Sequence, residues 1–176
     1  MTSVPPVGPE RRAGGRRWVR VRPHVDLLSI RAMRVLVLYE SRRGFTLTVA
    51  RALRDALRTH GVEATAAPLR GVDTGTIAAA DALVVGTWVS GLIVVGVGPA
   101  PGTGPAVDAL PDLAGRPTVV FCTCEVSPRA TLSTLSDWLE ARGADVRGRV
   151  VFRRKKSLAN APAVAESILA VLSADS

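Results

Sequence analysis

The sequence predicts a single α/β domain: a three-layer, doubly wound fold in which a five-stranded parallel sheet lies between helices. At 176 residues the chain is long enough to bury a sizeable core in one domain. Its composition is 47% hydrophobic but only 4% aromatic, so the core must be aliphatic, as in many parallel sheets. Short aliphatic runs alternate with segments whose apolar residues recur at helical spacing. This alternation favours parallel strands joined by right-handed crossovers.

Residues 1–32 are expected to form a disordered basic extension, and residues 33–176 the folded domain. The extension holds seven arginines against two acidic residues, and its two Arg-Arg pairs are followed by no apolar stretch typical of an export signal. Because it carries most of the net charge of +8, nucleic-acid binding by the folded part is not expected. Two alternatives stay open: an arm that contacts nucleic acid or acidic lipid, and upstream sequence included by a misassigned start, since Met33 directly precedes the first strand.

The first half of the domain is predicted to contain three strands and two helices. The strands are residues 34–39, 62–67 and 82–86, and the helices are residues 47–60, ended by Gly61, and 74–80. A Gly- and Pro-rich stretch, residues 87–104, is expected to be a flexible loop. Its Gly96-Val-Gly98 resembles a dinucleotide fingerprint, but Pro101 takes the place of the third glycine, so we exclude that motif.

The second half is predicted to add two strands, residues 118–122 and 146–152, after a short amphipathic piece at residues 107–113. Ser127 and Pro128 have the residue types of an N-cap and a first helical residue, and Gly143 ends the helix that follows. Asn160 is expected to cap a last helix.

The turn after the first strand has the residue types of a mononucleotide phosphate site. It lies where a parallel sheet binds ligands, and it leads into a helix N-terminus, whose free N–H groups and dipole favour an anion. Ser41 and Thr46 offer hydroxyls, Gly44 permits close backbone approach, and Arg42 or Arg43 adds positive charge. The alternative is an ordinary capped turn with solvated arginines.

Residues 39–46 resemble the opening of flavodoxins, whose phosphate loop has the pattern Thr/Ser-x-Thr-Gly-Asn-Thr. Ser41, Gly44 and Thr46 match it, whereas Arg43 replaces the middle Thr and Phe45 replaces Asn. An arginine at position 43 can replace the lost hydroxyl, and Phe45 offers only its backbone N–H. Residues 80–88 and 113–117 also resemble the family. The resemblance implies FMN as cofactor and the strand order 2-1-3-4-5, with the flavin between strands one and three.

The resemblance also places two loops beside the flavin ring. In the loop after the third strand, Trp88 could stack on the ring or plug the space beneath the loop, and both interpretations stay open. In the loop after the fourth strand the family usually has an aromatic residue, which is missing here, so the flavin would be more exposed. The residues implied to contact the ring are Thr87, Trp88, Val89, Gly91, Thr123 and Cys124.

Two cysteines, Cys122 and Cys124, are too close in sequence to form a disulfide across one face of a strand. We expect packing thiols, because no base that would activate Cys124 is found nearby. With only two histidines in the chain, a metal site is not expected. The cysteine usage favours a reducing cytoplasm, and no apolar run reaches the roughly 20 residues that span a bilayer.

A basic run follows the fifth strand and should lie at the same edge of the sheet: Arg153, Arg154, Lys155 and Lys156. It is expected to be a solvated charge run, or a docking site for an acidic redox partner or for the phosphate of a pyridine nucleotide.

These features favour an FMN-binding redox protein that carries electrons through a non-covalent flavin and serves a redox partner protein. Two alternatives stay open. One is a flavodoxin-like module that has lost FMN and acts in interaction or regulation, which Arg43 and Phe45 would explain. The other is an FMN-dependent NAD(P)H or quinone reductase. An electron carrier is favoured over an autonomous enzyme.

Overall fold

The computed structural model describes residues 33–92, 95–125, 127–128, 130–154 and 158–174. The predicted basic extension, residues 1–32, lies outside these ranges, as do Lys155 and Lys156 of the basic run.

Five parallel strands form the sheet in the order β2-β1-β3-β5-β6. They are β1 (Arg34–Tyr39), β2 (Glu63–Pro68), β3 (Ala82–Leu92), β5 (Pro117–Cys124) and β6 (Asp145–Arg153). Counted among the parallel strands alone, this order is the predicted 2-1-3-4-5, and a further strand, β4, pairs with β3. The strand order reverses between β1 and β3, and such a reversal opens a crevice at the carboxyl edge of the sheet.

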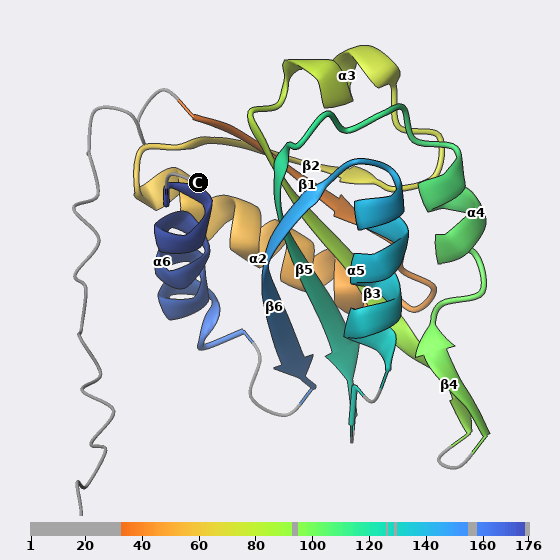
Figure 1. Cartoon of the computed structure of the whole chain (residues 1–176). Coiled ribbons are helices and arrows are strands. Elements are labelled where there is room, and N and C mark those ends of the chain that lie inside the picture. Colours follow the sequence, from red (N-terminus) through yellow and green to blue (C-terminus); the bar gives the residue numbers. More distant parts are fainter. Residues whose placement is uncertain (1–32, 93–94, 126, 129, 155–157, 175–176) are drawn as a thin grey trace, which may run out of the picture.

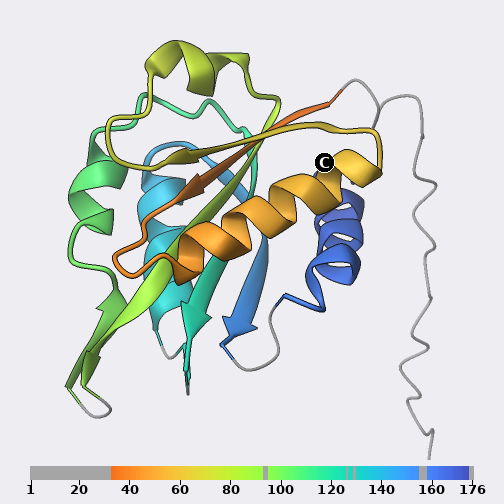
Figure 2. The same cartoon turned by 180° about the vertical axis from the view of Figure 1, so that it is seen from behind.

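Helices cover both faces of the sheet (Figures 1 and 2). One layer is α2 (Phe45–Thr59) and α6 (Ala161–Leu172), and the other is α3 (Thr74–Ala79), α4 (Thr103–Asp108) and α5 (Thr131–Ala141). On β1, Val35 and Val37 belong to the first core and Leu36 and Leu38 to the second. Alternate side chains of a strand point to opposite faces, so a strand covered on both sides is apolar throughout. No helix in the described ranges is both long and apolar enough to cross a membrane.

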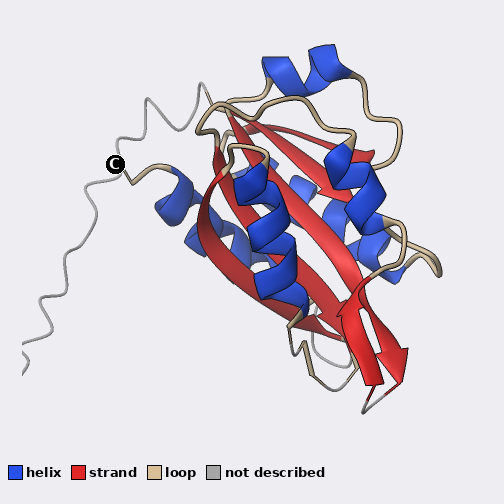
Figure 3. Ribbon diagram, turned by 45° about the vertical axis from the view of Figure 1, so that its right-hand side comes forward, coloured by secondary structure: helices blue, strands red, loops and turns tan. Residues whose placement is uncertain are grey.

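A β-hairpin occupies much of the stretch that was expected to be a flexible loop. β3 continues to Leu92, and β4 (Val95–Pro99) runs antiparallel to it with Val89 opposite Pro99. Figure 3 shows this hairpin extending past the other strands at the carboxyl edge of the sheet. The prediction was therefore wrong at residues 87–92, where β3 continues, and at residues 95–99, where alternating Val and Gly pair as a strand although glycine and proline are typical of loops.

One predicted helix start was also wrong, and the predicted amphipathic piece lies mostly beyond the helix found near it. α4 begins at Thr103 and ends at Asp108, before most of the amphipathic piece predicted at residues 107–113. α5 begins at Thr131, and Ala130, not Ser127, is its N-cap residue. Thr131 N–H donates to Pro128 O at 2.9 Å, so Pro128 belongs to a turn that precedes the helix.

The predicted helix ends are confirmed at two glycines, because Gly61 follows α2 with φ of 82° and Gly143 follows α5 with φ of 81°. These left-handed conformations suit glycine after a helix. Asn160 does precede α6, but its side chain makes no capping hydrogen bond.

Candidate functional site

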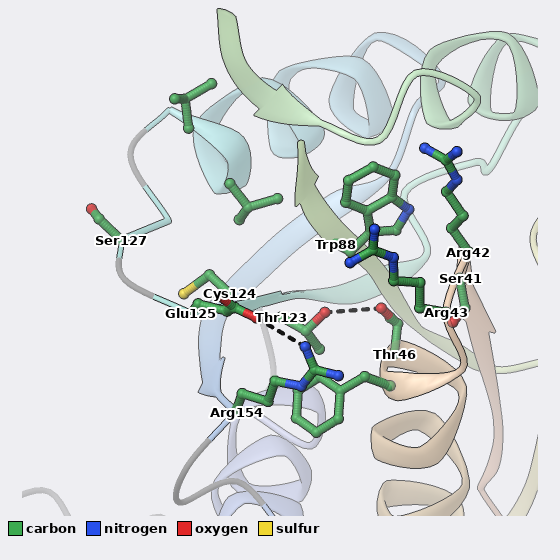
Figure 4. A pocket seen from close by; sticks show the side chains of 13 residues that line it. Ser41, Arg42, Arg43, Thr46, Trp88, Thr123, Cys124, Glu125, Ser127 and Arg154 are labelled. Carbon is green, nitrogen blue, oxygen red and sulfur yellow. Dashed lines mark hydrogen bonds and ion pairs between the residues drawn. The ribbon is translucent and has the colours of Figure 1, made fainter. Parts of the chain in front are cut away.

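A cavity of about 480 Å³ lies at the carboxyl edge of the sheet, between the β1–α2 turn and the ends of β3, β5 and β6 (Figure 4). Its lining comes from five separate segments of the chain. The lining residues are Ser41, Arg42, Arg43, Phe45, Thr46, Trp88, Val89, Val97, Thr123, Cys124, Glu125, Ser127 and Arg154.

The β1–α2 turn presents unpaired backbone donors at one end of this cavity. Gly44 is the N-cap residue of α2 and has φ of 85°, a left-handed conformation that glycine adopts without strain. The first backbone bond of the helix runs from Thr48 N–H to Gly44 O, at 2.9 Å. Within the described residues, the N–H groups of Phe45, Thr46 and Leu47 have no acceptor. Such groups point back along the helix axis toward the turn, where an anion would accept hydrogen bonds from them.

The hydroxyl of Ser41 is a second unpaired donor in the same turn. Its Oγ is buried, and no hydrogen-bond partner for it exists in the described part of the chain. A buried hydroxyl without a partner costs free energy, so a ligand atom that pairs with it would be bound favourably. The residues present therefore fit a phosphate group.

Thr46 has a different partner. Its Oγ1 lies 2.9 Å from Thr123 Oγ1, and only 1% of Thr46 is exposed, so this bond ties the start of α2 to the end of β5. Figure 4 shows the two hydroxyls facing each other, one from the start of α2 and one from the end of β5.

Phe45, which departs from the family pattern, is held by Arg154 at the end of β6. The Arg154 Cζ lies 5.6 Å from the centroid of the Phe45 ring, and Arg154 Nη1 lies 2.8 Å from Glu125 Oε1. The ring is partly buried against the core cluster that includes α2 and α6. The aromatic side chain thus joins the start of α2 to the loops after β5 and β6. Arg154, which was expected at this edge of the sheet as part of a solvated or docking run, lines the cavity.

The hairpin gives the cavity an apolar wall. Trp88 and Val89 of β3 and Val97 of β4 line it, and Trp88 is half-buried. In Figure 4 the Trp88 side chain lies on the same side of the cavity as the β1–α2 turn. Sequence reasoning missed Val97, because its place depends on the pairing of β4 with β3.

The structure brings nine of the twelve predicted cofactor residues to this cavity. Of the other three, Gly44 shapes the turn, and Gly91 lies in the hairpin. Thr87 is wholly buried behind the wall, where its Oγ1 lies 2.8 Å from Thr103 Oγ1 and accepts a bond from Ala100 N–H. Its side chain is thus turned toward the start of α4, away from the cavity.

Both cysteines are free and buried. Burial, with a smaller contribution from neighbouring Cys124, raises the pKa of Cys122 to about 12. Burial also raises the pKa of Cys124, although the charge of Arg153 opposes the shift. A thiol with a raised pKa stays protonated at neutral pH and is a poor nucleophile. Across the described ranges, no group of three or more His, Cys, Asp or Glu side chains is arranged to hold a metal ion.

No family model matches the sequence, and no curated protein matches it. Solved structures do match. A two-electron reduced flavodoxin from Megasphaera elsdenii is 18% identical with a TM-score of 0.62, over 77% of this chain and 98% of that one. A flavodoxin from the domain Archaea is 17% identical with a TM-score of 0.63, over 78% and 96% of the two chains. The chain has the flavodoxin-like fold. An oxidised flavodoxin from Bacillus cereus matches it likewise, at 19% identity and a TM-score of 0.60, over 77% of this chain and 97% of that one.

Proposed function

We propose that this flavodoxin-like protein binds FMN non-covalently and carries electrons. The observation that carries the proposal is the set of unpaired donors at the β1–α2 turn: the buried Ser41 Oγ and the N–H groups of the first turn of α2. They lie at one end of a cavity of about 480 Å³ that has an apolar wall, so one ligand with a phosphate and a flat apolar ring would satisfy both parts.

In this proposal the phosphate is held by Ser41, by the main chain from Gly44 to Thr46 and by Arg42 or Arg43. The ring lies against Trp88 and Val89 on one side, and against the β5 end on the other, where Thr123 and Cys124 line the cavity. Bound FMN supplies one- and two-electron transfer, while the protein binds and orients it and sets the charge around it.

Titration of the purified protein with FMN tests the proposal. We expect quenching of flavin fluorescence with FMN and much weaker binding of riboflavin, which lacks the phosphate. Ser41→Ala should weaken FMN binding about tenfold, because a hydrogen bond to a charged group is worth roughly 1.5 kcal/mol or more. Ser173→Ala is the matched control, since Ser173 Oγ is also buried without a partner in the described chain but lies beyond the end of α6.

Three other outcomes have distinct meanings. A protein that ignores FMN at tens of micromolar contradicts the proposal and favours a flavodoxin-like module for interaction or regulation. Equal binding of FMN and riboflavin contradicts the phosphate site. Rapid NAD(P)H oxidation by the FMN-loaded protein would favour a reductase.

We also propose that the redox partner is acidic and docks at the end of β6, near Arg153, Arg154, Lys155 and Lys156. Arg153 and Arg154 are both exposed there. Electron transfer to an acidic redox protein should slow as salt is added, because salt screens the attraction, whereas transfer to a basic one of similar potential should not. Substitution of Arg153 and Arg154 by alanine should make the electron-transfer rate less dependent on salt concentration. An unchanged dependence of the rate on salt would contradict the proposal.

A further inference from the structure

The cavity has an excess of positive charge. Three arginines line it, Arg42, Arg43 and Arg154, against one acidic residue, Glu125. Arg42 and Arg43 are exposed, and neither makes an ion pair with any described residue. Glu125 is paired with Arg154 at 2.8 Å, so no carboxylate among the described residues pairs with the two guanidinium groups of the turn.

The charge of Arg154 has a restricted position at the cavity, and the other two arginines lie on the β1–α2 turn. Arg154 is held by the Phe45 ring and Glu125, and its N–H donates to Cys124 O at 3.1 Å. Arg42 and Arg43 belong to the turn that Gly44 ends. The first turns of α2 and α5, which open at the same edge, contain no acidic residue, so their dipoles add to the positive potential.

A further arginine, Arg153, acts on one group that lines the cavity. The charge of Arg153 acts on the thiol of Cys124 in the direction that favours its anion, although burial dominates the pKa of that thiol. A ligand in this cavity would meet the same potential, because the apolar wall keeps the local dielectric below that of water.

We infer that Arg42, Arg43 and Arg154 make this cavity bind reduced FMN more tightly than oxidised FMN, and so raise the midpoint potential above that of free FMN. The inference rests on the proposed function. Oxidised flavin has a neutral ring system, and uptake of two electrons and one proton gives the ring one negative charge. Positive charge in the cavity favours this anion over both the oxidised ring and a ring that takes up a second proton.

A potentiometric titration with dithionite and reference dyes tests the inference on the FMN-loaded protein. We expect reduced FMN to bind about tenfold more tightly than oxidised FMN, which corresponds to a rise of about 30 mV for a two-electron couple. The potential should change by about 30 mV per pH unit between pH 6 and 8, because one proton accompanies two electrons.

Charge variants give shifts of opposite sign. The double variant Arg42→Gln/Arg43→Gln should lower the ratio of the affinity for reduced FMN to the affinity for oxidised FMN about tenfold. Arg154→Gln should lower this ratio less. Glu125→Gln, which frees the charge of Arg154, should raise it. Weaker phosphate binding affects both oxidation states equally and cancels in this ratio. Arg54→Gln is the control, because Arg54 lies on α2, pairs with Asp55 and is absent from the cavity lining.

The outcomes separate this inference from the proposed function. FMN that binds with a potential below that of free FMN, or with the same ratio in every arginine variant, overturns the inference and leaves the electron carrier standing. A slope of about 60 mV per pH unit would mean two protons and a neutral reduced ring, which also overturns it. A protein that takes up no FMN overturns both.

Discussion

Gly86→Ala is expected to lower the free energy of unfolding by about 3 kcal/mol, because the interior has no room for one more methyl group. A Cβ at Gly86 would lie 1.9 Å from Cζ of Phe121, which is wholly buried on the neighbouring strand β5. Phe121 cannot move aside easily, since its ring packs edge-on against Phe152 with centroids 5.8 Å apart. Urea unfolding followed by circular dichroism measures the loss.

Two variants make this prediction specific. Gly98→Ala in β4 should leave stability nearly unchanged, because a Cβ there has no neighbouring atom within 4 Å. In a Phe121→Leu background, Gly86→Ala should cost much less than in the wild type, because the ring that it would overlap is gone. Equal losses in both backgrounds would show that the contact with Phe121 is not the cause.

The parallel sheet could be predicted from the sequence because its signal is local. Strands buried on both faces are aliphatic at successive positions, as in residues 35–38, and this distinguishes them from the helices between them. β4 lacked such a signal. Its glycines and proline are typical of a loop, and only pairing with β3 makes it a strand. The start of α5 was misjudged for the opposite reason, since Ser127 and Pro128 have capping residue types and the true N-cap, Ala130, has none.

The candidate site could likewise be predicted only where its residues are adjacent in sequence. The β1–α2 turn is one continuous segment, so its serine, glycine and arginines could be identified together. Val97, Glu125 and Arg154 reach the cavity only through tertiary pairing: β4 folds back on β3, and the register of β5 with β6 puts Cys124 opposite Arg153. The contact of Phe45 with Arg154 joins residues more than a hundred positions apart, and no local pattern could have indicated it.

Gly44→Val is expected to weaken FMN binding by up to about a hundredfold. A β-branched residue at a φ of 85° is strained by roughly 2–3 kcal/mol, and the free protein can relieve this strain by rotating the turn. Rotation would turn the N–H groups at the start of α2 away from the phosphate. Binding would then have to restore the strained conformation, so the strain appears as lost affinity. Fluorescence titration measures the dissociation constant, and urea unfolding measures stability without FMN.

Gly115→Val is the matched control. Gly115 also has a positive φ, 72°, and open space at its Cβ, but it precedes β5 at the opposite edge of the sheet. It should lose stability and keep its FMN affinity. Gly44→Asn should retain most of the affinity, because asparagine tolerates the left-handed conformation better than other side chains. If Gly44→Val binds FMN as the wild type does, the phosphate does not depend on the main chain of this turn. If Gly115→Val loses as much affinity as Gly44→Val, general destabilisation explains both.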